Sequence, residues 1–137
     1  MKYINLFEDF NPESSTPLSN PEDAILLDSA EWTVVVPKTF DSALYWSEGT
    51  YWEITKSSPE VFDSLMEEGD MFIIIDKTHN EKYQFHIPSD TLCDSNNRFF
   101  PFSSFFTDKP EVKAAIESRF ASYDKPALKA FQNLTQI

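Results

Sequence analysis

The chain has 137 residues, of which 41% are hydrophobic and 25% charged. A chain of this length forms one domain with one core, which excludes a multidomain enzyme. The net charge is −12, and residues 1–90 hold 18 acidic but only 5 basic residues. Because phosphate contacts depend on Lys and Arg, this charge opposes direct binding to nucleic acids and to anionic membranes.

The compartment follows from what the chain lacks. No apolar run approaches the roughly 20 residues that span a bilayer. The N-terminus lacks the basic stretch and apolar core of a signal peptide. The single cysteine, Cys93, has no partner for an internal disulfide, which fits a reducing compartment. We therefore expect a cytosolic protein in which Cys93 is a small buried residue.

Residues 1–23 differ in pattern from the rest. Residues 1–10 place apolar side chains three and four apart, which predicts a short amphipathic helix. Residues 11–23 carry three prolines and three serines without periodicity, which is typical of an extended arm. We expect this N-terminal segment and arm to precede a single domain over residues 24–137.

Local signals place several elements in the first part of that domain. The β-branched run before Pro37 indicates a strand, and Thr39 is a suitable helix cap. Pro59 favours a first helical turn, and Gly69 favours a helix end. After the short apolar run 25–27, the pattern predicts a strand ending at Val36, a helix over 40–46, a strand over 50–55, a helix over 59–68, a central strand over 71–76, a turn over 77–81 and a strand over 82–87.

The last third adds two helices and one unusual segment. Residues 88–98 are rich in turn formers. Residues 98–106 hold five of the 13 phenylalanines around Pro101, and we interpret this segment as a strand and loop. Pro110 and Pro126 each open a helix with an apolar stripe, so a helical hairpin is expected. The predicted fold is α+β, with a small, mostly antiparallel sheet of about four strands and short helices.

The phenylalanine-rich segment is the first candidate binding site. As a core element, it would lie under the C-terminal helices. As an exposed patch, it would mark an interface with a protein partner. The side chains concerned are Phe99, Phe100, Phe102, Phe105 and Phe106.

A second candidate is a pocket on the outward face of the strand over 82–87. Gln84 and His86 would share this face with either Trp52 or Glu53 of a neighbouring strand, and His86 would supply a titratable group. The alternative is an ordinary solvated strand face. We assign no catalytic residue, no metal site and no cofactor, because two glycines cannot form a phosphate-binding loop and the two histidines and one cysteine have no ligand spacing.

The middle of the chain resembles a known module. The order VVVPKTFDSALYWSEGTYWEIT, FDSLMEEGDMFIIIDK and KYQFH, within residues 32–97, resembles a module of uncharacterised proteins from large tailed bacteriophages. The resemblance implies a phage origin and no particular activity. Glu53 stands where the module often has Cys, so thiol chemistry of relatives could not operate here.

The first ten residues, MKYINLFEDF, carry a second resemblance. They look like N-termini of large myovirus-type phage proteins that direct packaging into the capsid and are cleaved after a Glu. Glu13 would then end the cleaved segment. The alternative is a plain N-terminal helix that docks on the domain.

The expected function is that of a phage-encoded acidic accessory protein of the host-takeover or anti-defence type. It would bind a host or virion protein through the phenylalanine-rich segment or an acidic face of the sheet. We expect a monomer or homodimer in the host cytoplasm or the virion. One alternative is a virion structural or internal head protein with an N-terminal targeting segment. Another is a small ligand-binding or enzymatic domain with a pocket near Trp52 and His86.

Overall fold

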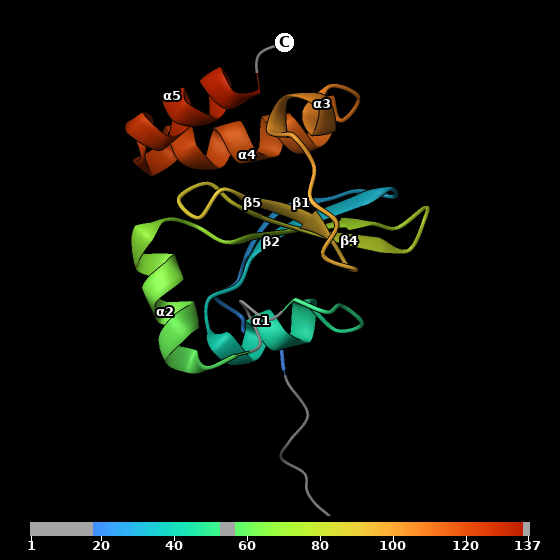
Figure 1. The fold of residues 1–137 in the computed structure, drawn as a ribbon, viewed down its shortest axis with the longest axis vertical. Helices are drawn as coiled ribbons and strands as arrows, with labels where there is room; N and C mark the ends of the chain where they lie inside the picture. Colours follow the sequence, from blue (N-terminus) through green and yellow to red (C-terminus); the bar gives the residue numbers. More distant parts are fainter. Residues whose placement is uncertain (1–17, 53–56, 136–137) are drawn as a thin grey trace, which may run out of the picture.

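The computed structural model describes residues 18–52 and 57–135. In the described ranges, one sheet separates two layers of helices (Figure 1). The expected N-terminal helix, Glu13 and most of the arm lie outside the described residues. The same holds for Glu53 and for residues 54–55 of the strand expected over 50–55.

The sheet has five antiparallel strands, each paired with the next along the chain. This confirms the predicted α+β class and the antiparallel sheet. The strand over Phe72–Asp76 is central, as its continuous apolar run predicts, since both of its faces are covered. The strands are β1 (Ala24–Asp28), β2 (Trp32–Val36), β3 (Phe72–Asp76), β4 (Glu81–His86) and β5 (Thr91–Asp94).

Helices cover both faces of the sheet: α1 and α2 lie on one side, and α3, α4 and α5 lie on the other (Figure 1). Thr39 closes a capping box at the start of α1, and Ser58 caps α2 with Pro59 at its first position. The predicted C-terminal hairpin is the contacting pair α4 and α5. The helices are α1 (Phe40–Trp46), α2 (Pro59–Glu68), α3 (Phe102–Phe106), α4 (Pro110–Tyr123) and α5 (Lys125–Leu134).

The main core lies between the sheet and the C-terminal helices. Phe85 of β4 is fully buried there, and its ring packs against the rings of Phe72, Phe102, Phe106 and Phe131 at centroid distances of 5.2–5.6 Å. A smaller cluster on the other face contains Val35, Trp52, Ile73 and Cys93. Cys93 is therefore buried, as predicted.

Three local predictions were wrong. Tyr51 and Trp52 are not in a strand. The Trp52 side chain instead packs on the sheet face that carries Val35 and Ile73, and its indole donates to the Asp94 carbonyl at 2.7 Å. Residues 91–94 form β5 within the segment interpreted as turns. This strand was missed because it has only four residues and directly follows a turn residue, Asp90, whose φ is positive. Phe102–Phe106 is a helix rather than a strand and loop.

The end of the expected arm contacts α1. The Leu18 amide donates to the Asp41 carboxylate, at the start of that helix, at 3.0 Å. The Asp23 carboxylate accepts from the Lys38 amide at 2.6 Å and from the Trp46 indole at 2.9 Å. Residues 18–23 are thereby hydrogen-bonded to the helix that follows β2.

Candidate functional site

The face of β4 that carries Gln84 and His86 is not solvated. His86 is fully buried, and Gln84 has an exposed fraction of 1%. The layer formed by α1, α2 and Trp52 covers them, so the predicted outward orientation was wrong. Periodicity placed these residues on the correct face, but it could not show that chain segments from elsewhere cover that face.

His86 is committed to structural hydrogen bonds. Its Nε2 lies 2.8 Å from the Leu65 carbonyl and 3.2 Å from the Gly69 carbonyl. Because carbonyl oxygens only accept, Nε2 carries a proton, and Nδ1 is hydrogen-bonded to the Ser89 hydroxyl at 2.7 Å. The imidazole thus satisfies carbonyls at the C-terminal end of α2, and both ring nitrogens are occupied.

The cross-strand neighbours of Gln84 are apolar. Its partners in the ladders are Ile73 on β3 and Cys93 on β5, and Val35 continues the row on β2. Within residues 18–52 and 57–135, the buried Gln84 Oε1 atom has no hydrogen-bond partner. Burial, with a smaller effect of Asp94, raises the pKa of the Cys93 thiol to about 11, so this thiol is a poor nucleophile near neutral pH.

Lys82 on β4 and Gly49 after α1 have structural roles. The Lys82 ammonium donates to the carbonyls of Trp46 and Glu48 at 2.8 and 2.9 Å. A cation in this place complements the negative end of α1. Gly49 follows with a φ of 86°, a conformation that glycine adopts without strain. These contacts tie the end of α1 to β4.

The phenylalanine-rich segment is mainly core. Phe102, Phe105 and Phe106 lie on the buried face of α3, because residues three and four apart share one side of a helix. They cannot form an exposed patch in the folded chain, which corrects that part of the binding prediction. Phe100 is half-buried, and its ring packs against Tyr83 and Phe105.

Of the five phenylalanines in this segment, Phe99 alone is largely exposed. Its exposed fraction is 66%, and that of Leu134, at the end of α5, is 42%. Phe99, Phe100, Pro101 and Leu134 line an open groove of about 340 Å³, together with Asp90, Phe102 and Ser103. The segment thus leaves one aromatic side chain and one groove at the surface.

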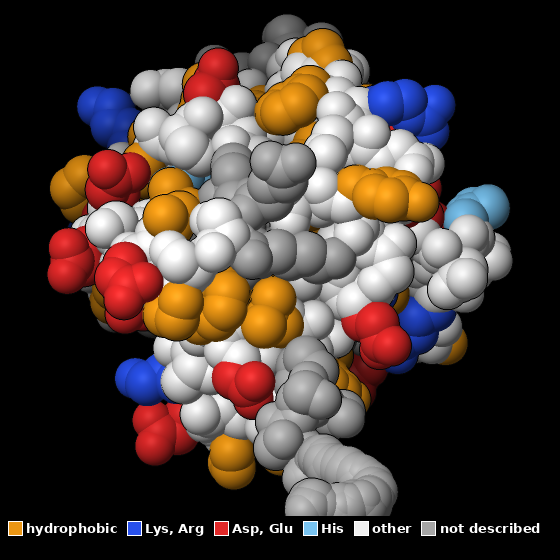
Figure 2. Space-filling model, turned by 60° about the horizontal axis from the view of Figure 1, so that its bottom comes forward, with side chains coloured by type: hydrophobic (Ala, Val, Ile, Leu, Met, Phe, Trp, Pro, Cys, Tyr) orange, Lys and Arg blue, Asp and Glu red, His pale blue; other side chains and the backbone are white. Residues whose placement is uncertain are grey.

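The outer face of α2 is acidic. Glu60, Asp63, Glu67 and Glu68 are all exposed, and residues 57–76 contain no Lys or Arg. Figure 2 shows acidic side chains gathered at the left, on the side where α2 lies in Figure 1. This face accounts for part of the net charge and repels anionic partners.

A second, wider cleft lies where the β3–β4 hairpin approaches the turn between α3 and α4. It has a volume of about 400 Å³. Its lining combines two aromatic side chains with three carboxylates, one histidine and one lysine: Trp32, Tyr83, Asp76, Glu81, Asp108, His79 and Lys109. No spacing in the sequence signals this cleft, because its residues come from separate strands and turns.

The pKa values of Asp76 and Asp108 in the cleft both lie below their ordinary value, that of Asp108 because of the Lys109 ammonium. Burial raises the pKa of Asp76, but hydrogen bonds from the His79 side chain and amide outweigh it, so that pKa lies below its ordinary value. The Asp76–His79 distance between Oδ2 and Nδ1 is 2.8 Å. Burial raises the pKa of the Tyr83 phenol, and the charges of Glu81 and Asp76 raise it further. The phenol therefore lies in a negative potential.

The described residues offer no metal centre or membrane span. In residues 18–52 and 57–135, no three His, Cys, Asp or Glu side chains converge closely enough to hold a metal ion. No helix in these ranges is long and apolar enough to cross a membrane. No family model, curated protein or solved structure matches the chain.

Proposed function

We propose that the chain is a protein-binding module that docks its partner through the groove beside Phe99. The observation that carries this proposal is the contrast within one segment. Phe102, Phe105 and Phe106 are buried, whereas Phe99, three residues before this helix, is 66% exposed. An exposed aromatic side chain beside a groove is typical of an interface anchor.

The groove offers both a projecting and a receiving part. Phe99 projects, while Phe100, Pro101 and Leu134 provide apolar walls in a groove of about 340 Å³. Full burial of one phenylalanine side chain contributes on the order of 1.5–3 kcal/mol. A protein partner with a matching apolar side chain fits this surface better than a charged small molecule.

The proposal includes a phage origin, because residues 32–97 resemble the phage module. The partner would then be a host or virion protein, and the complex would lie in the host cytoplasm or the virion. An enzymatic pocket at Trp52 and His86 has less support, since both side chains are buried and hydrogen-bonded within the fold.

The experiment is affinity capture from lysate of phage-infected host cells, followed by mass spectrometry. The baits are the wild-type chain, Phe99→Ser and Val61→Ser, an exposed apolar residue of α2 that serves as the matched control. The proposal expects a stoichiometric protein that the wild type and Val61→Ser capture and Phe99→Ser does not. Equal capture by all three baits would contradict it.

A further inference from the structure

We propose that the cleft between the β3–β4 hairpin and the α3–α4 turn binds an organic cation, namely an ammonium or guanidinium group on an aliphatic chain. This site is separate from the Phe99 groove and lies beyond the proposed function. Its volume of about 400 Å³ falls in the usual range for small-ligand sites, roughly 300–1,000 Å³.

The first argument is the chemistry of the walls. Trp32 and Tyr83 both line the cleft, and aromatic faces attract cations through the ring quadrupole. Asp76, Glu81 and Asp108 add three carboxylates to the same lining. An anion would meet repulsion from these carboxylates.

The second argument is that the cation already present is used internally. The Lys109 ammonium donates to the Phe105 carbonyl at 2.9 Å and to Asp108 at 3.0 Å, and it lies 4.1 Å from the centre of the Phe105 ring. Its charge is thus held at the rim by α3. Asp76 pairs with His79, while Glu81 bonds to Ser95 and to the Lys82 amide.

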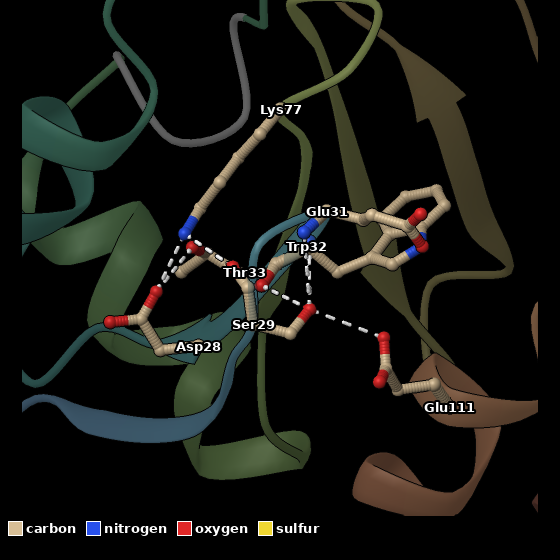
Figure 3. Close-up of polar contacts among 7 residues, drawn as sticks. All are labelled: Asp28, Ser29, Glu31, Trp32, Thr33, Lys77 and Glu111. Atoms are coloured by element: carbon tan, nitrogen blue, oxygen red, sulfur yellow. Dashed lines mark hydrogen bonds and ion pairs between the residues drawn. The ribbon is translucent and has the colours of Figure 1, made fainter.

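The third argument is that hydrogen bonds and an ion pair hold the turn leading into Trp32 (Figure 3). The Ser29 hydroxyl accepts from the Trp32 amide at 3.1 Å and lies 3.2 Å from Glu111 of α4, to which it can donate. Lys77, after β3, donates to the Asp28 carboxylate and to the Ser29 carbonyl, each at 2.7 Å.

These bonds join the β1–β2 turn to the end of β3 and to α4. The start of β2, where Trp32 lies, is therefore ordered before any ligand arrives. Backbone order at Trp32 lowers the entropic cost of binding.

The test is a titration of the full chain followed by two-dimensional NMR. The probes are N-acetylarginine amide, which represents a side chain of a basic peptide, n-butylammonium, a free amine, and N-acetylnorleucine amide, a neutral control. The proposal predicts saturable shifts of the Trp32 indole N–H with one or both cations, with dissociation constants of about millimolar order. The neutral compound should give none.

The two cations distinguish the source of the ligand. Binding of the arginine derivative alone supports a side chain of a protein partner, and equal binding of n-butylammonium supports a free amine. Absence of saturable shifts with both cations, or equal shifts with the neutral compound, would overturn the proposal.

Variants test the charges separately. Asp108→Asn should weaken binding about two- to five-fold, and Lys109→Met should strengthen it by removing a competing cation. Asp63→Asn, with the same charge change on α2, is the matched control and should have no effect. An equal loss in Asp63→Asn would contradict a specific site.

The proposals for the Phe99 groove and for the cation-binding cleft can be refuted separately. Phe99→Ser should bind the cations as the wild type does, while it loses the protein partner. The same NMR spectra report whether each variant is folded, so a loss of binding is not confused with unfolding.

Discussion

Truncation of Phe106 tests whether the phenylalanine-rich segment belongs to the core or forms an exposed patch. Phe106 has an exposed fraction of 1%. Its ring lies 5.3 Å from that of Phe85, 4.9 Å from that of Phe105 and 5.2 Å from that of Phe131, as centroid distances. Phe106→Ala removes all three ring contacts and leaves a cavity between α3, α5 and the sheet.

The expected loss is about 3–5 kcal/mol in the free energy of unfolding. Phe99→Ala should cost less than about 0.5 kcal/mol, because a surface substitution without such contacts has little effect. The assay is urea unfolding followed by circular dichroism, which gives both values from the transition midpoint and slope. A loss below about 1 kcal/mol for Phe106→Ala would refute the assignment of this segment to the core.

Three further changes test the sheet face under α1 and α2, each by urea unfolding. His86→Leu should lower the free energy of unfolding by about 2–3 kcal/mol, because buried carbonyls at the end of α2 lose their donor; a neutral result would contradict the hydrogen bonds assigned to Nε2. Gln84→Met should raise it by about 1 kcal/mol, since the variant removes an unpaired buried oxygen; a loss of stability would show that this oxygen has a partner. Burial raises the pKa of Asp94, but hydrogen bonds from the amides of Arg98 and Asn96 and from the Arg98 guanidinium outweigh this effect, so the pKa of Asp94 lies below its ordinary value. The stability that this carboxylate adds is complete above the unfolded-state pKa and is lost as pH falls through the lower folded-state value. Asp94→Asn should therefore reduce the loss of stability below about pH 4, and an unchanged pH profile would count against this role.

Much of the fold follows from local signals. Thr39 caps α1, and Pro59 and Pro110 open α2 and α4, as predicted. These signals act within one turn of helix, so the sequence displays them directly. The apolar run of β3 likewise indicates a strand covered on both faces.

The errors share a different physical cause. Gln84 and His86 alternate correctly along β4, but α2 and Trp52 cover them through contacts distant in sequence. The spacing of Phe102, Phe105 and Phe106 is helical, yet the density of aromatic residues around Pro101 favoured a strand. The exposure of Phe99 and the cleft between the β3–β4 hairpin and the α3–α4 turn depend on which side chains remain uncovered after packing. No local pattern in the sequence determines this.

The measurement that tests the central claim most directly is the dissociation constant of the captured partner, purified, for the wild-type chain and Phe99→Ser. If Phe99 is an anchor, its loss should weaken binding by about 2 kcal/mol, or roughly 30-fold. Val61→Ser should bind as the wild type does. An unchanged dissociation constant for a folded Phe99→Ser variant would show that the partner does not dock at this groove.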